Sequence, residues 1–215
     1  MHQFDLKSKT AIITGGAQGF GLDIAKRFLK SGAKVIIWDI DEKELKNAVN
    51  VVNDSNLSYC VVDVSNFKNV KDTVDKIVKS SNVDILINNA GIMACPETRV
   101  GNEWESQFAV NHIGHHLLTK ELMDSFNENG ESRLVSLSSS AHSITKILWD
   151  DIHYENGEYN KWTAYGQSKT ASSLLAIEFD RKMKNKGVRG FAVHPGGIIT
   201  PVSYTHLTLP TTPYV

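Results

Sequence analysis

Six short apolar segments alternate with segments of helical periodicity, and this alternation limits the possible folds more than any other feature of the chain. The apolar segments are rich in β-branched residues and apolar throughout, as strands buried on both faces must be. They are KTAIIT (9–14), KVIIWD (34–39), SYCVVDV (58–64), VDILINNAG (83–91), SRLVSLSSS (132–140) and VRGFAVHPG (188–196). The periodic segments predict helices over residues 20–30, 41–52, 66–80, 102–126 and 162–186. Short connections between such elements require right-handed crossovers. The sequence therefore predicts an α/β fold, a doubly wound parallel sheet of six strands in three layers.

Composition excludes several classes of function. The 215 residues carry a net charge of −1, which provides no basic surface for nucleic acid or an anionic membrane. No apolar run approaches the ~20 residues that span a bilayer. The N-terminus MHQFDLKSKT lacks the apolar segment of a signal peptide. We therefore expect a cytoplasmic protein that acts on a small molecule.

Cysteine and histidine spacing indicates neither a disulfide framework nor a metal site. Cys60 and Cys95 form no CxxC pair. His112, His115 and His116 are close in sequence, but no carboxylate or cysteine accompanies them at ligand spacing. We expect no metal, and the three histidines are interpreted as polar positions of a helix.

A glycine-rich turn follows the first predicted strand. TGGAQGFG (14–21) has the pattern TGxxxGxG, with glycines at 15, 19 and 21. Glycine permits a turn with positive φ and lets a pyrophosphate approach the amides at a helix N-terminus. Because the turn lies between a predicted strand and a predicted helix, it indicates dinucleotide binding. The alternative is a tight strand-to-helix turn without a ligand.

Polar residues also follow the next three strands. Asp39 ends the second strand, where a carboxylate accepts hydrogen bonds from ribose hydroxyls and repels a 2′-phosphate, which favours NAD over NADP. The alternative is a solvated aspartate at a strand end. Asp63 and Val64 follow the third strand, where we expect the adenine ring, and NNAG (88–91) follows the fourth.

Together these motifs resemble the short-chain dehydrogenases/reductases, a family with a Rossmann fold. The resemblance covers about residues 8–201 and includes TGxxxGxG, Asp63, NNAG, Asn111, the serines after the fifth strand, YxxxK and HPGGIIT, all in the family's order. Up to NNAG the chain is similar to bacterial oxoacyl-carrier-protein reductases and polyol dehydrogenases. From GIMACPETR onward it resembles the retinol-dehydrogenase-like branch. That branch usually has a basic residue for NADP where this chain has Asp39, so NAD and NADP both remain candidates.

The segment TAYGQSK (163–169) contains the family's YxxxK motif. Tyr165 and Lys169 are four residues apart and share a helix face. Free tyrosine has a pKa of about 10, and a nearby ammonium lowers it by stabilising the phenolate. Tyr165 is then expected to take or give the substrate proton. The alternative is two surface residues of an ordinary helix.

The resemblance implies roles for further residues. Lys169 would also hold the nicotinamide ribose, and Asn111 would support Lys169 through a water. The catalytic serine is expected to be Ser139, by comparison of SSSAH with SSxAH, and Ser138 is the second choice. The dinucleotide contacts implied are Thr14, Gly15, Gln18, Gly19, Phe20, Gly21, Asp39, Asp63, Val64, Asn89, Ala90, Gly91, Tyr165, Lys169, Pro195, Gly196, Ile198 and Thr200.

The last residues depart from the family pattern. After HPGGIIT, family members usually continue with helices that cover the substrate and with a seventh strand, but here PVSYTHLTLPTTPYV follows. We expect one Rossmann domain over residues 1–201, lacking that seventh strand, and an irregular tail over 202–215. A truncated gene with a foreign tail and a genuine short C-terminus both explain the tail. For the preceding HPGG segment, the alternative to cofactor binding is a Pro-Gly turn without a ligand.

The sequence thus predicts an NAD(P)-dependent oxidoreductase that interconverts an alcohol and a carbonyl. A non-catalytic dinucleotide-binding protein and an inactive truncated fragment are the alternatives. Residues 104–123 are apolar on more than one side, which suits an interface between subunits. We therefore expect a homodimer or homotetramer.

Overall fold

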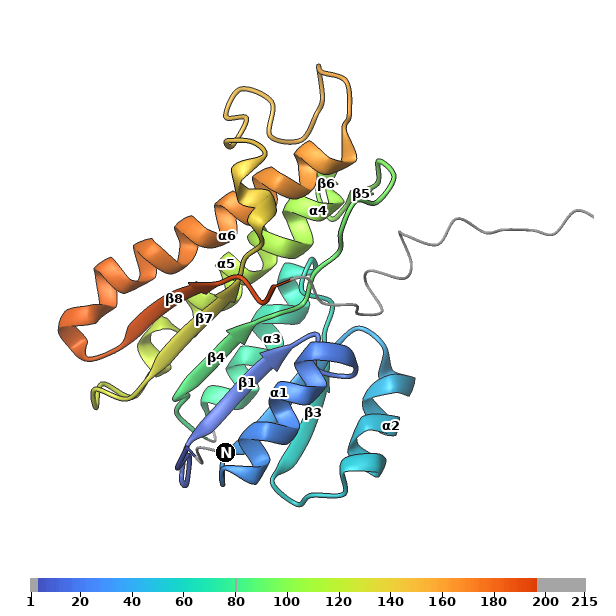
Figure 1. The fold of residues 1–215 in the computed structure, drawn as a ribbon. Coiled ribbons are helices and arrows are strands. Elements are labelled where there is room, and N and C mark those ends of the chain that lie inside the picture. Colours follow the sequence, from blue (N-terminus) through green and yellow to red (C-terminus); the bar gives the residue numbers. More distant parts are fainter. Residues whose placement is uncertain (1–3, 80, 197–215) are drawn as a thin grey trace, which may run out of the picture.

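A six-stranded parallel sheet forms the centre of the protein (Figure 1). The structure is a computed structural model that describes residues 4–79 and 81–196. The strands are β1 (Thr10–Thr14), β2 (Lys34–Asp39), β3 (Leu57–Val61), β4 (Ile85–Asn88), β7 (Arg133–Leu137) and β8 (Arg189–Val193). Their order, β3-β2-β1-β4-β7-β8, is that of a doubly wound sheet. The predicted fold class is confirmed.

Helices cover both faces of the sheet. On one face, α1 (Gly19–Lys30) and α2 (Glu42–Val52) pack through Ala25, Leu29, Leu45 and Ala48 against strand residues such as Ile13 and Ile37. On the other face, α3 (Phe67–Val78), α5 (Gly114–Glu121) and α6 (Lys161–Met183) pack against residues such as Ile12 and Leu86. Because neighbouring residues of a strand point to opposite faces, Ile12 and Ile13 belong to different cores. This explains why the strand segments are apolar throughout.

Side-chain caps set the starts of several helices, including α2 and α3. The Asp41 carboxylate accepts a hydrogen bond of 3.0 Å from the backbone amide of Glu44, at the start of α2. The Asn66 side chain accepts one of 3.0 Å from the amide of Asn69, at the start of α3. Each cap satisfies an amide that has no partner within its own helix. The helix predicted over residues 66–80 is thus present and begins directly after Asn66.

The helical region predicted over roughly residues 102–126 is present, but it starts at Ser106 and is not a single regular α-helix. A short hairpin precedes it, formed by β5 (Arg99–Val100) and β6 (Trp104–Glu105), because Gly101 and Glu103 have left-handed backbones with φ of 58° and 59°. The helical part starts with α4 (Ser106–Phe108), where the Glu105 carboxylate accepts from the amides of Gln107 and Phe108. It continues through a π-helix (Ala109–Ile113) into α5 and ends in a 3₁₀ turn (Met123–Ser125). A π-helix within a helix often marks a functional site, and this one contains Asn111.

Intramolecular packing covers part of the segment expected at a subunit interface. Phe108 and Leu118 are buried within the chain, and Val110 lines the main pocket. The large apolar residues of α6 that remain exposed are Trp162, Leu174 and Ile177, at 43%, 47% and 61%. The oligomer expected from segment 104–123 stays a prediction, and the exposed apolar residues of α6 offer a second candidate surface. Among the residues that the structure describes, no helix is long and apolar enough to cross a membrane.

Candidate active site

A pocket of about 710 Å³ lies at the carboxyl ends of the strands, where the strand order reverses at β1 and β4. Ligands of doubly wound sheets bind at this point. The pocket contains most of the residues predicted for the site: Gly15, Gln18, Gly19, Phe20, Gly21, Asp39, Asp63, Val64, Asn89, Ala90, Gly91, Ser139, Tyr165, Lys169, Pro195 and Gly196. The structure thus brings together residues from all parts of the described chain.

At two positions of the first turn only glycine fits, because neighbouring parts of the chain lie too close to leave room for a Cβ atom. Gly15 has φ of 63°, and a Cβ there would lie 2.9 Å from Ala90 Cα. A Cβ on Gly21 would lie 2.1 Å from the carbonyl oxygen of Gly15. Neither position accepts a larger residue without movement of the backbone. The turn therefore passes directly against the end of β4, and α1 begins at the pocket wall.

The start of α1 has the features of an anion site. Its N-cap residue, Gln18, makes no side-chain capping hydrogen bond, and the first turn contains no acidic residue. Helix N-termini carry unpaired amides and a partial positive charge, which favour a phosphate group. Gln18, Gly19, Phe20 and Gly21 all line the pocket at this point.

Asp39 and Asp63 both line the pocket. The Asp39 carboxylate accepts hydrogen bonds from the amide of Ala17, at 3.2 Å, and from the amide of Asp41, at 3.3 Å. The Asp63 carboxylate accepts from both the amide and the hydroxyl of Ser65, at 2.9 and 2.7 Å. The Ala17 amide thus holds the Asp39 carboxylate beside the glycine turn, and Ser65 holds the Asp63 carboxylate after β3.

Ser138 and Ser139, the two candidates for the catalytic serine, have different surroundings. The Ser138 hydroxyl is buried, 2.7 Å from the Ser173 hydroxyl and 3.3 Å from the carbonyl oxygen of Lys169. The Ser139 hydroxyl instead lies close enough to the Tyr165 phenol to lower its pKa. Since residues next to each other in extended backbone face opposite ways, only one of the two faces the phenol. The geometry favours Ser139.

Tyr165 and Lys169 lie together, with Lys169 Nζ 5.6 Å from the centre of the Tyr165 ring. Burial raises the pKa of the Tyr165 phenol, and the nearby Ser139 hydroxyl opposes the rise. This is opposite to the lowering by lysine that we expected, because removal from water penalises the phenolate. Burial also lowers the pKa of Lys169 to about 8. Its ammonium donates a hydrogen bond of 3.0 Å to the carbonyl oxygen of Leu137.

Thr14 and Asn111 lie behind the pocket wall rather than in it. The Asn111 side chain hydrogen-bonds both the amide and the carbonyl of Ile92, each at 2.9 Å, and donates to the Ser168 hydroxyl at 2.9 Å. The Thr14 hydroxyl accepts from the amides of Asn89 and Ala90, at 2.9 and 3.0 Å. Both residues thus position the wall segment 89–92. Ile198 and Thr200 lie outside the described residues.

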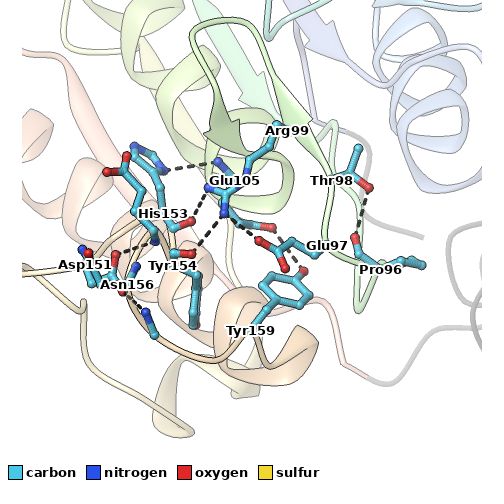
Figure 2. Close-up of polar contacts among 12 residues, drawn as sticks. Pro96, Glu97, Thr98, Arg99, Glu105, Asp151, His153, Tyr154, Asn156 and Tyr159 are labelled. Atoms are coloured by element: carbon cyan, nitrogen blue, oxygen red, sulfur yellow. Dashed lines mark hydrogen bonds and ion pairs between the residues drawn. The ribbon is translucent and has the colours of Figure 1, made fainter.

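A cluster of polar residues joins two segments beyond the pocket (Figure 2). The Arg99 guanidinium donates to the backbone carbonyls of His153 and Tyr154 and pairs with Glu97 at 2.6 Å. The Tyr159 hydroxyl donates to the carbonyl oxygen of Cys95 at 3.0 Å and lies 3.3 Å from Glu105 Oε1. These bonds tie the segment after β4 to the segment after β7.

Sequence reasoning missed several residues of the site. Trp38, Ile40, Val62, Ile92, Met93, Val110, Leu137, Ser140 and His194 also line the pocket. Most of them directly precede or follow a predicted residue, which is the signal that points to them. His115 is bonded to Thr14, and its role had no signal in the sequence. Within the described part of the chain, no group of three or more His, Cys, Asp or Glu is placed to hold a metal ion.

Comparison with known proteins gives a consistent result. The sequence profile described as short chain dehydrogenase matches residues 9–207. Retinol dehydrogenase 13 from Homo sapiens is 36% identical over 196 residues, which are 89% of this chain and 59% of that protein. The first curated relatives are thus matched over 59% of their length.

Solved structures agree with these relatives. An uncharacterised protein from Mycobacterium paratuberculosis superposes with a TM-score of 0.82 at 32% identity, over 90% of this chain and 70% of that one. The 3-ketoacyl-(acyl-carrier-protein) reductase from Brucella melitensis, solved with NADH, gives 0.77 at 27% identity, over 94% and 80%. The chain therefore belongs to the short-chain dehydrogenase family, whose members are oxidoreductases that act on CH–OH groups.

Proposed function

We propose that this chain interconverts an alcohol and a carbonyl by hydride transfer with a nicotinamide dinucleotide. One observation carries the proposal: Ser139, Tyr165 and Lys169 meet in the same pocket as the glycine turn at the start of α1. A phosphate-binding turn and a proton-transfer group within one pocket are the two parts that such a reaction needs.

The residues present fit a dinucleotide. The space that a Cβ on Gly15 or Gly21 would fill is already closed by backbone, so the turn presents main chain to the pocket. The uncapped start of α1 suits the pyrophosphate, and Asp39 suits ribose hydroxyls. We infer a preference for NAD over NADP, because a carboxylate repels a 2′-phosphate. A bound nicotinamide would supply or accept the hydride.

Tyr165 is the proposed acid and base. With its pKa raised by burial, the phenol is neutral near pH 7 and ready to give its proton to a carbonyl oxygen. The Ser139 hydroxyl, which touches the phenol, is placed to hold the same oxygen. Lys169 is proposed to support the phenolate in the alcohol-oxidising direction and to hold the ribose. Asn111 keeps the wall beside Lys169 in place through Ile92.

Binding and turnover test the proposal together. We would titrate the protein with NADH and with NADPH by fluorescence, and then follow NADH oxidation with a straight-chain aldehyde such as decanal. The expected result is saturable NADH binding that is tighter than NADPH binding, with aldehyde-dependent NADH oxidation. Saturable binding without turnover of any aldehyde, alcohol or ketone tried would instead support a non-catalytic dinucleotide-binding protein.

A further inference from the structure

His115 is a buried histidine that has no part in the reaction proposed above. It lies in α5 with 1% of its surface exposed. Its Nε2 lies 2.8 Å from Thr14 Oγ1, and its Nδ1 lies 2.9 Å from the carbonyl oxygen of Asn111. The ring therefore bridges the end of β1 and the π-helix.

The hydrogen bonds of Thr14 determine which nitrogen of His115 carries the hydrogen. A hydroxyl has two acceptor positions and one hydrogen. The amides of Asn89 and Ala90 occupy both acceptor positions. The hydroxyl hydrogen can therefore be donated to one of two acceptors. His115 Nε2 lies 2.8 Å from Thr14 Oγ1, whereas the carbonyl oxygen of Ile87 lies 3.4 Å from it. Nε2 is thus the acceptor, and Nδ1–H donates to Asn111. Burial keeps this ring neutral by lowering its pKa to about 4.

The bridge holds one wall segment at both of its ends. At one end, the Thr14 hydroxyl accepts hydrogen bonds from the amides of Asn89 and Ala90. At the other end, the Asn111 side chain accepts a hydrogen bond from the amide of Ile92 and donates one to its carbonyl. Gly91 lies between them, where a Cβ would be 3.1 Å from Asn111 Oδ1 and 3.7 Å from Lys169 Nζ. Segment 89–92 therefore separates the glycine turn from Lys169.

We propose that His115 is a positioning residue whose neutral ring ties Thr14 to the Asn111 carbonyl and so sets segment 89–92 between the dinucleotide and Lys169. The inference rests on the proposed function, since it assigns the two ends of that segment to cofactor binding and to catalysis. The Thr14 end orients Asn89 and Ala90 toward the dinucleotide. The Asn111 end orients Ile92 beside Lys169.

Two substitutions of His115 each remove one of its two hydrogen bonds, so that the Thr14 end and the Asn111 end of segment 89–92 can be tested separately. His115→Asn places an amide nitrogen near the position of Nδ1, which keeps the donor to Asn111 and removes the acceptor for Thr14. His115→Gln places an amide oxygen near the position of Nε2, which keeps the acceptor for Thr14 and removes the donor. We expect His115→Asn to weaken NADH binding about three- to tenfold with little change in kcat for decanal, as for the loss of one hydrogen bond. His115→Gln should lower kcat by a similar factor and leave the Kd for NADH nearly unchanged.

The control is His116→Gln, the same change at the exposed neighbour, which should alter neither quantity. If both His115 variants lose binding and turnover in parallel, or neither loses anything, His115 is only structural and the inference fails. The tautomer is tested without cofactor or substrate, by ¹H–¹⁵N correlation of the His115 ring. A hydrogen on Nε2 would overturn the inference. Absence of NADH binding in the parent would instead count against the proposed function.

Discussion

The Lys169 ammonium donates a hydrogen bond of 3.0 Å to the carbonyl oxygen of Leu137, the last residue of β7. Lys169 is 6% exposed, and burial lowers its pKa from 10.5 to about 8. One backbone carbonyl replaces only part of the hydration that the ammonium loses on folding. The protein thus keeps a charged group where it costs stability, as active sites often do.

Lys169→Met is therefore expected to stabilise the protein and to impair its function. The pKa of Lys169 is about 8 in the folded protein and 10.5 in the unfolded chain. Its charge therefore destabilises the fold fully below pH 8, and this destabilisation decreases as the pH rises from 8 to 10.5. Methionine removes the charge but leaves Leu137 without its donor, so we expect a net gain of about 1–2 kcal/mol in unfolding free energy at pH 7. Urea unfolding at pH 7 and pH 10 measures it, and the gain should shrink at the higher pH. Lys161→Met, at an exposed lysine of the same helix, is the control; equal or lower stability of Lys169→Met at pH 7 would contradict the expectation.

Tyr165→Phe should remove turnover and spare binding. The substitution keeps the ring and removes only the proton-transfer hydroxyl, so kcat for aldehyde reduction should fall by ~10²–10⁴-fold while the Kd for NADH stays unchanged. The matched control is Tyr154→Phe, which removes a buried hydroxyl that has no hydrogen-bond partner. That control should keep its activity and lose no stability. Near-parental turnover by Tyr165→Phe would mean that another group moves the proton.

Alanine substitutions of the two serines should have different effects on kcat in the same assay of aldehyde reduction. Ser139→Ala removes the hydroxyl that touches Tyr165, and kcat should fall by roughly 10–10³-fold. Ser138→Ala removes the buried hydrogen bonds to Ser173 and Lys169, which should cost about 1 kcal/mol of stability and change kcat little. Steady-state kinetics and thermal unfolding of both variants measure the difference. The reverse pattern would assign the catalytic role to Ser138.

Asp39→Ala should narrow the difference in affinity between NADH and NADPH. The variant loses a carboxylate that repels a 2′-phosphate and accepts from ribose hydroxyls, so NADPH should bind more tightly and NADH more weakly than in the parent. Asp41→Ala serves as the control, because it removes the cap of α2, worth about 1 kcal/mol, without touching the pocket. Fluorescence titrations with both cofactors give the ratio. An unchanged ratio in Asp39→Ala would mean that other groups select the cofactor.

Subunit association should depend on α6. Leu174 and Ile177 are exposed on this helix, and exposed apolar side chains grouped on one helix often mark an interface. Sedimentation velocity at micromolar concentration should show a dimer or tetramer for the parent and a monomer for Ile177→Glu. A parent that sediments only as a monomer would contradict the expected assembly.

Local pattern was sufficient to predict most of the fold. Apolar runs such as KTAIIT, each followed by a segment of helical periodicity, predict strands and helices. A strand buried on both faces is apolar throughout, whereas a helix buried on one face has apolar residues every three to four positions. The glycine turn and the pair Tyr165 and Lys169 were recognisable for the same reason, since their chemistry depends on residues at most seven positions apart. The start of the helical region predicted over 102–126 was placed too early, because Gly101 and Glu103 adopt turn conformations that the apolar period does not encode.

The sequence by itself thus determined the alternation of strands and helices along the chain, the glycine turn after the first strand and the tyrosine–lysine pair. Only the tertiary structure showed that the two candidate serines have different surroundings, Ser138 beside Ser173 and Ser139 beside the Tyr165 phenol. It also reversed the expected direction of the Tyr165 pKa, because burial is a property of the whole fold. The bridge from Thr14 through His115 to Asn111 joins residues 101 positions apart. Such a contact exists only after the sheet and helix have packed, so no local pattern encodes it.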